Sequence, residues 1–169
     1  MPGIDKPHVS WAPDAEMGKT FVGEKIVVVG AGQVGLEAAI DFKRLGKDVC
    51  VIELLDNQTA TANLFKAAKR VTYEFLDIME KEGIPIHYNV KLSEIRDDKI
   101  ICEDTTTGNT TDFACDTVLI AIGMTPLTEK AAEMRHCAPE TSVRIVGDAE
   151  EVGSIHTAVN SAFRAALNI

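Results

Sequence analysis

The chain of 169 residues is long enough for one ordinary domain, or for one domain with an appendage. A hydrophobic share of 46% with 25% charged residues is typical of a soluble globular protein and excludes a disordered one. The net charge of −9, without any Lys/Arg cluster, argues against nucleic acid or an anionic membrane as a partner. No apolar run reaches the roughly 18–20 residues of a membrane span. Since the N-terminus also lacks the layout of a signal peptide, we expect a cytoplasmic protein.

Four widely spaced cysteines contain no C-x-x-C pair: Cys50, Cys102, Cys115 and Cys137. This spacing disfavours both a zinc site and a thioredoxin-like redox pair. We therefore expect buried, apolar thiols in a reducing compartment, and no metal site.

The first half of the chain predicts a βαβ unit. Residues 1–22 carry three prolines and two glycines without a sustained pattern, which predicts an extended lead-in. The run "KIVVVG" at 25–30 is typical of a strand buried on both faces of a parallel sheet. An amphipathic helix over 33–46 and a second buried strand over 48–53 follow.

The second half predicts one long amphipathic helix over 61–83, a third parallel strand over 84–89 and a small antiparallel meander. The strands of the meander are expected at 91–98, 99–104 and 111–116. A further apolar strand at 117–123, a last strand at 143–149 and a last helix at 154–167 should follow.

Together these elements predict an α/β fold. A Rossmann-like parallel sheet should carry helices on one face and the antiparallel meander on the other, in three layers β/β/α. We expect a lead-in over 1–22, the dinucleotide-binding domain over 23–126 and a strand–helix appendage over 127–169. The apolar edge of this appendage would be open to pairing, so a homodimer is compatible with the sequence.

A glycine motif follows the first strand and opens the first helix. Residues Gly30, Ala31, Gly32, Gln33, Val34 and Gly35 fit G-x-G-x-x-G in the strand–turn–helix context that such a motif requires. The first glycine permits a tight turn, the second lets the backbone approach a pyrophosphate, and the third lets the helix pack closely. The N–H groups of the helix N-terminus would bind the phosphates. The motif therefore predicts a dinucleotide site; the alternative is a tight turn without a ligand.

An acidic residue closes the second strand. Glu53 lies 23 positions after Gly30, close to the spacing of about 20 at which a carboxylate binds the adenosine ribose. This carboxylate would repel a 2′-phosphate, and the following "LLDNQ" offers no Arg or Lys to hold one. The pattern favours NADH over NADPH; the alternative is an ordinary solvated strand end.

Several of these stretches, in this order, resemble one family. "VVVGAGQVGLEAA", the meander, "DTVLIAIGMTP" and "VRIVGDA" are similar to the flavoprotein reductases of the pyridine nucleotide–disulfide oxidoreductase type, which have two dinucleotide domains. "PGIDKPHV" and "GDAEEVGSIHTAVNSAFRAALNI" further resemble the C-terminal part of NADH:flavin oxidoreductases. Those are 2-enoate and 2,4-dienoyl-CoA reductases, in which an old-yellow-enzyme barrel precedes the dinucleotide domains. The resemblance covers nearly the whole chain.

The resemblance implies that an NADH domain is inserted within an FAD domain. "PGIDKPHV" would be the outgoing connection, "AIGMTP" the start of the return, and "VRIVGDA" the last strand of an incomplete FAD domain. Asp148 would match the aspartate that binds the flavin ribityl chain, and the last helix would point its start at the isoalloxazine. Glu37 would lie near the nicotinamide, or serve only as an early-helix carboxylate favoured by the dipole. The implied cofactor-binding residues are Gly30, Ala31, Gly32, Gln33, Val34, Gly35, Glu37, Glu53, Leu54, Ala121, Ile122, Gly123, Met124, Gly147, Asp148, Ile155, His156 and Thr157.

The resemblance also implies that the chain is a fragment of a longer reductase. The whole enzyme would pass hydride from NADH to FAD and on to a second flavin that reduces an enoate-type alkene. FMN and an iron–sulfur cluster would belong to the missing parts, and the missing FAD and barrel domains would be the partners. The fragment alone should bind NADH without turnover and carries no catalytic residue. Two alternatives stay open: a piece of a disulfide reductase or NADH oxidase, and a non-catalytic NAD-binding module that senses redox state.

Overall fold

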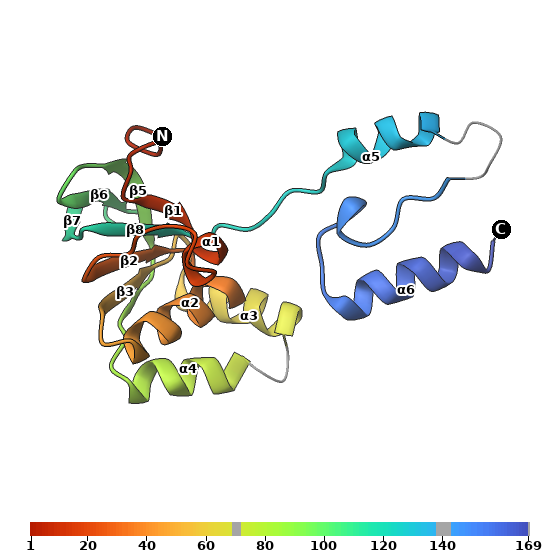
Figure 1. The fold of residues 1–169 in the computed structure, drawn as a ribbon. Coiled ribbons are helices and arrows are strands. Elements are labelled where there is room, and N and C mark those ends of the chain that lie inside the picture. The colour runs from red at the N-terminus through yellow and green to blue at the C-terminus, as the bar shows by residue number, and fades with distance from the viewer. Residues whose placement is uncertain (69–71, 138–142, 169) are drawn as a thin grey trace. The chain divides into compact units, whose positions relative to one another are not determined.

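The structure, a computed structural model, describes residues 1–68, 72–137 and 143–168 (Figure 1). The chain forms two compact units, Met1–Ile122 and Gly123–Ile169. Each unit is described by itself below. In the described part of the chain, no helix is long and apolar enough to cross a membrane.

The first unit is built on a five-stranded sheet in the order β1-β8-β2-β3-β4. Every neighbouring pair in it is parallel. β2 lies at the centre, and four of its five residues are buried because both faces of the sheet are covered. The strands are β1 (Val9–Trp11), β2 (Lys25–Val29), β3 (Asp48–Ile52), β4 (Ile86–His87) and β8 (Thr117–Ile120).

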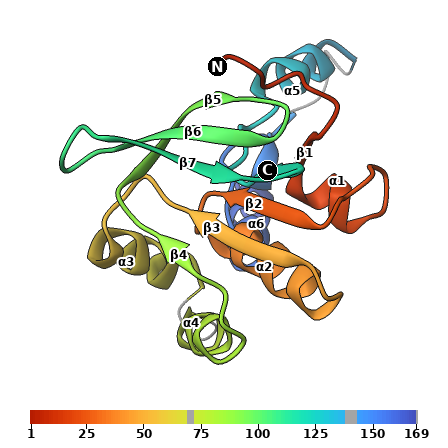
Figure 2. The same ribbon diagram turned by 90° about the vertical axis from the view of Figure 1, so that its left-hand side faces the viewer.

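Helices cover one face of this sheet and a second, antiparallel sheet covers the other (Figure 2). Alternate residues of β2 show both layers: Ile26 and Val28 pack in the helix-side core, and Val27 and Val29 pack against the meander. The three-layer α/β prediction is confirmed. The helices are α1 (Ala12–Glu16), α2 (Gln33–Arg44), α3 (Asn57–Ala68) and α4 (Thr72–Lys81), and the meander is β5 (Val90–Ile95), β6 (Lys99–Asp104) and β7 (Thr110–Ala114).

Residues 1–22, predicted as an extended lead-in, contain a strand and a helix that the sequence did not predict. This segment forms β1, which pairs with β8 in the register Val9↔Val118, and α1, whose Ala12 and Ala15 are buried in the helix-side core. Its first residues also contact the meander, where the Ile95 N–H donates to the Pro2 carbonyl at 3.0 Å. A three-residue strand is too short to show a period, and its partner lies far along the chain.

The single helix predicted over 61–83 was also wrong in extent. The structure has α3 and α4 on either side of residues 69–71, which lie outside the described residues. The two helices run in different directions (Figure 2), and the rings of Phe65 and Tyr73 meet edge to face with centroids 5.7 Å apart. Both helices keep an apolar face toward the sheet, so the helical period alone could not show the break.

The second unit contains α5 (Thr128–Met134), η1 (Arg135–Cys137), η2 (Gly147–Ala149) and α6 (Ile155–Ala166). The helix predicted over 154–167 is confirmed, but the strand predicted over 143–149 is wrong. Residues 143–146 have no regular structure and 147–149 form a 3-10 turn. A strand needs a neighbour for its ladder of hydrogen bonds, and the described residues of this unit contain no strand that could pair with it.

Cysteine thiols lie between the parallel sheet and the meander. Cys102 and Cys115 are buried, as predicted, and Cys50 is half-buried. The side chain of Cys137 lies outside the described part. Burial raises the pKa of Cys50 and Cys115 to about 11 and that of Cys102 to about 12. These thiols therefore stay protonated and unreactive near neutral pH.

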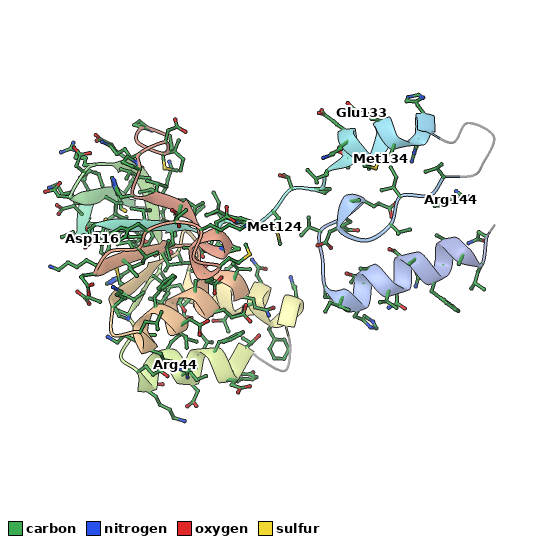
Figure 3. All side chains as sticks on the ribbon, viewed as in Figure 1. Arg44, Asp116, Met124, Glu133, Met134 and Arg144 are labelled. Atoms are coloured by element: carbon green, nitrogen blue, oxygen red, sulfur yellow. The ribbon has the colours of Figure 1, made fainter. Side chains whose placement is uncertain are left out.

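Asp116, labelled in Figure 3, connects the meander to β8. Replacing it by Asn should lower the stability of the fold at neutral pH. Its carboxylate accepts hydrogen bonds from the N–H groups of Glu24 at 2.9 Å and Lys25 at 3.1 Å. Burial disfavours the charged form, but these bonds and one from the Thr117 hydroxyl outweigh it, so the pKa of Asp116 lies below its ordinary 3.8. The stabilisation is present above the ordinary pKa and is lost as pH falls through the lowered one.

Urea unfolding at neutral and acidic pH measures this effect. Asp116→Asn should unfold at lower urea than the wild type at pH 7, and the difference should shrink in acid, because protonation removes the same charge. Asp48→Asn is the matched control, since Asp48 is an exposed carboxylate at the start of β3. A difference of equal size at both pH values would contradict the linkage.

Candidate functional site

The turn from β2 into α2 begins at Gly30, a position at which only glycine fits. Its φ of +107° lies in the left-handed region, and a Cβ there would come within 2.6 Å of the Ala121 carbonyl oxygen. The Gly30 N–H donates to the Ile52 carbonyl at 2.8 Å. The turn is therefore held between the ends of β3 and β8.

Gly32 caps α2 and faces open space. It is extended (φ −74°, ψ 175°), no side chain caps the helix, and a Cβ built on it meets nothing within 4 Å. The first intrahelical bond runs from the Leu36 N–H to the Gly32 carbonyl at 3.0 Å. The N–H groups of the first turn have no partner within the helix, and the turn contains no acidic residue. This arrangement suits an anion such as a pyrophosphate.

Gly35 brings α2 against the turn. A Cβ on this residue would lie 2.0 Å from the Gly30 carbonyl oxygen and 3.2 Å from the Ala121 Cβ. No side chain larger than hydrogen fits there while the helix keeps its place. The three glycines of the motif therefore differ: Gly30 and Gly35 are enclosed, and Gly32 is open.

Glu53 follows β3 and points its carboxylate at the glycine turn. Its Oε2 accepts from the Ala31 N–H at 2.7 Å, and its Oε1 accepts from the Leu55 N–H at 2.9 Å. The sequence predicted a ribose contact here and missed both backbone contacts. A carboxylate has about four acceptor positions, so each oxygen keeps one for a ribose hydroxyl. The residue fits the adenosine ribose of a dinucleotide.

Other predicted residues lie at the same edge of the sheet, where β2, β3 and β8 end. Leu54 is 53% exposed and Ile122 is 69% exposed, whereas Ala121 is buried and donates its N–H to the Val29 carbonyl at 2.9 Å. Glu37 is half-buried on α2 and accepts from the Gln33 side chain at 3.2 Å. The first unit thus brings the glycine motif, Glu53 and two exposed apolar side chains to one edge.

Tyr88 is a candidate that the sequence reasoning did not single out. It follows β4 and is half-buried, and burial together with the negative charge of Glu53 raises its pKa. The phenol is therefore neutral near pH 7 and can donate a hydrogen bond. The available signal was its position directly after the third predicted parallel strand.

The remaining predicted residues belong to the second unit. Met124, labelled in Figure 3, lies in the segment before α5, and Gly123 precedes it in the same unit. The Gly147 N–H donates to the Ser161 hydroxyl at 2.8 Å, and the Asp148 carboxylate accepts from the Gly153 N–H at 3.1 Å. Within this unit, the structure therefore brings Gly147 and Asp148 together with the residues around α6.

The start of α6 is well capped and exposed. Thr157 and Ser154 form a reciprocal capping box, with the Thr157 N–H donating to the Ser154 hydroxyl at 3.3 Å. The His156 Nε2 and the Asn160 side-chain amide nitrogen form a hydrogen bond of 2.9 Å, and Ile155 is 87% exposed. The N–H of Thr157 is thus already used by the cap.

Solved structures show the class of fold. The structure aligns with a TM-score of 0.81 to 6-hydroxypseudooxynicotine amine oxidase from Pseudomonas geniculata N1, at 21% identity, covering 98% of this chain and 25% of that one. It aligns at 0.77 to 2-naphthoyl-CoA reductase, at 23% identity, covering 100% and 24%. Thioredoxin reductase of T. acidophilum gives 0.65 at 19% identity, covering 99% and 59%. The fold is the Rossmann-like α/β fold of FAD- and NAD(P)-binding domains.

The sequence shows the family itself. Residues 4–156 match the family model described as pyridine nucleotide-disulphide oxidoreductase. The chain belongs to this family, and membership implies an oxidoreductase domain that binds FAD or NAD(P).

Curated relatives share the same region. Cinnamate reductase of Clostridium sporogenes is 29% identical over 167 residues, covering 99% of this chain and 24% of that protein. Dihydrolipoyl dehydrogenase of Haloferax volcanii is 29% identical over 138 residues, covering 76% and 27%. The chain thus spans about a quarter of the length of these relatives.

Proposed function

We propose that this chain is the NADH-binding part of a flavin-dependent oxidoreductase of the NADH:flavin oxidoreductase group. The whole enzyme passes hydride from NADH to FAD and on to a second flavin, which reduces an enoate-type alkene. The observation that carries the nucleotide assignment is the open Gly32 at the start of α2 beside the Glu53 carboxylate. The similarity to cinnamate reductase over 99% of the chain supports the enoate-type substrate.

In this proposal the residues of the chain bind and orient. A bound NADH supplies the hydride. The N–H groups at the start of α2 hold its pyrophosphate, and Glu53 accepts from its adenosine ribose while repelling a 2′-phosphate. Leu54 would contact the adenosine end, and Ala121 and Ile122 of the first unit would contact the nicotinamide. The same contact is proposed for Gly123 and Met124, which belong to the second unit. Glu37 would lie near the nicotinamide, as the family resemblance implies.

We assign the second unit to the FAD domain of the longer enzyme. Asp148 accepts one backbone N–H and keeps free acceptor positions for a flavin ribityl hydroxyl. We also assign Gly147 and the α6 residues Ile155, His156 and Thr157 to the flavin-binding site of that domain. FMN and an iron–sulfur cluster belong to other parts of the proposed enzyme, together with the barrel domain.

The exposed stripe on α6 supports a missing partner domain. Ile155, Val159, Phe163 and Leu167 recur every four residues and are between 62% and 87% exposed. Such a stripe is typical of a helix that packs against a core. In the proposed enzyme the rest of the FAD domain covers this stripe. In the isolated chain the same stripe would favour a homodimer.

A second candidate function is a piece of a disulfide reductase. The similarity to dihydrolipoyl dehydrogenase over 76% of the chain favours it. Its nucleotide site would be the same, and the two functions differ only in the acceptor of the electrons. Finding an old-yellow-enzyme barrel encoded upstream in the same gene would support the enoate reductase, and a first FAD segment with paired cysteines would support the disulfide reductase.

Titration of the chain with NADH, NADPH and FAD tests the proposed function. We expect NADH to bind more tightly than NADPH, because Glu53 repels the 2′-phosphate, and we expect no stoichiometric binding of FAD. Isothermal calorimetry measures all three on one protein preparation. Tighter binding of NADPH would contradict the role given to Glu53, and stoichiometric FAD would contradict an incomplete FAD domain. Absence of NADH binding would contradict the proposal as a whole.

A further inference from the structure

The Glu53 carboxylate joins two loops of the nucleotide site. We define the Glu53 bridge as its two bonds, from Oε2 to the Ala31 N–H at 2.7 Å and from Oε1 to the Leu55 N–H at 2.9 Å. We propose that Glu53 is a positioning residue that fixes the glycine turn before a dinucleotide arrives. Its effect then extends to the pyrophosphate, beyond the ribose contact. The inference deepens the proposed function and rests on it for its binding test.

Ala31 needs this contact. It lies between Gly30 and Gly32, belongs to no helix or strand, and is only 7% exposed. A buried backbone N–H without a partner is costly, and the secondary structure supplies none at this position. The charged carboxylate satisfies it at a distance typical of strong, charge-assisted hydrogen bonds.

Glu53 is itself held firmly. Its N–H donates to the His87 carbonyl at 2.8 Å, and its carbonyl accepts from the Val90 N–H at 2.8 Å. The backbone is thus fixed on the side of β4 and β5 while the side chain reaches the glycine turn. A residue anchored in this way can hold the Ala31 N–H in a fixed position.

The glycine turn is fixed at one end only. Gly30 is enclosed and its N–H donates to the Ile52 carbonyl, whereas Gly32 has no Cβ and meets no protein atom within 4 Å. Without the bridge, the segment 31–32 would therefore sample more backbone conformations. Ordering it on binding would then cost affinity. The Glu53 bridge removes that cost in advance, and it does so whether or not the ligand has ribose hydroxyls.

Amide hydrogen exchange of the ligand-free chain tests the bridge directly. The Ala31 amide should exchange slower than a free peptide by about tenfold or more, the protection that a hydrogen bond to a charged group gives. In Glu53→Gln this protection should fall, because the amide nitrogen of Gln would face one of the two N–H donors. The Val28 amide in β2 should stay protected and reports that the variant is folded.

Glu103→Gln is the matched control, since Glu103 is an exposed carboxylate in the meander whose ion pair is with Lys91. It should leave the Ala31 amide unchanged. Exchange of the Ala31 amide at the free-peptide rate in the wild type would overturn the proposal, even if Glu53→Gln failed to fold.

A pair of ligands separates the bridge from a ribose contact. ADP has the ribose hydroxyls that Glu53 can bind, and 2′,3′-dideoxy-ADP lacks them. We expect Glu53→Gln to weaken binding of 2′,3′-dideoxy-ADP by about tenfold, because the bridge is lost. Binding of ADP should weaken by more, because the variant loses both the bridge and the ribose contact. Equal binding of the dideoxy ligand to wild type and variant would overturn the inference. A protected Ala31 amide without binding of ADP or NADH would support the bridge and overturn the proposed function instead.

Discussion

Gly32→Ala should abolish most NADH binding and leave the protein folded. The backbone at this residue is extended and accessible to alanine, and the added Cβ meets no protein atom within 4 Å. Loss of the glycine at a helix N-cap costs only about 0.5–1 kcal/mol. The methyl group would instead occupy the space through which a pyrophosphate approaches the helix N-terminus, so affinity should fall by about a hundredfold.

Calorimetric titration and urea unfolding on the same preparation measure both quantities. The expected result is a near-normal unfolding midpoint with a large rise in the NADH dissociation constant. Wild-type affinity in Gly32→Ala would show that the pyrophosphate does not lie against this residue. A large loss of stability would contradict the open space that the structure places there.

Gly35→Ala, the same change three residues later, should destabilise the fold. Alanine in the interior of a helix normally stabilises by up to about 1 kcal/mol relative to glycine. Here its Cβ would lie 2.0 Å from the Gly30 carbonyl oxygen, a backbone atom that cannot rotate away. Since α2 buries Leu36 and Phe42, it cannot shift without losing packing. We therefore expect a loss of about 3 kcal/mol in the free energy of unfolding.

Urea unfolding monitored by circular dichroism measures this loss, and Gly32→Ala is the matched control for adding one methyl group to the same turn. NADH binding should fall as well, because the displaced helix carries the phosphate-binding N–H groups. A stability equal to or above that of the wild type would show that α2 is not held by the close approach of Gly35.

Local pattern was sufficient for the centre of the fold. The β-branched run 25–29 predicted a strand buried on both faces, and the glycine motif after it predicted the turn into α2. The meander also followed from alternation and turn residues. Each of these signals lies within one element and its immediate neighbours, so no knowledge of distant partners was needed.

The errors concern elements defined by distant partners. β1 is three residues long and exists because β8 lies beside it, and residues 143–149 do not form a strand because no described neighbour pairs with them. A single sequence shows propensity, whereas a strand also requires a partner. The apolar faces of α3 and α4 continue one helical period, which explains why the sequence predicted one helix in place of two.

For the candidate site, spacing located Glu53 but could not give its rotamer. The position after β3 predicted a carboxylate at the nucleotide edge. Whether that carboxylate faces solvent or the Ala31 N–H depends on how the loops fold back, which no residue count contains. The glycines do not show this limit, because the motif predicted an open second glycine and a closely packed third one, and the structure leaves Gly32 open and encloses Gly35.

The sheet order has a consequence for synthesis on the ribosome. β8 lies between β1 and β2, although it is the last strand of the first unit to be translated. Until residues 117–121 emerge, β1 has no neighbour and the Gly30 turn lacks the Ala121 carbonyl that encloses it. Pairings between distant segments form slowly because a long loop must close first. The nascent chain therefore acquires its nucleotide turn only after residues 117–121 have been made.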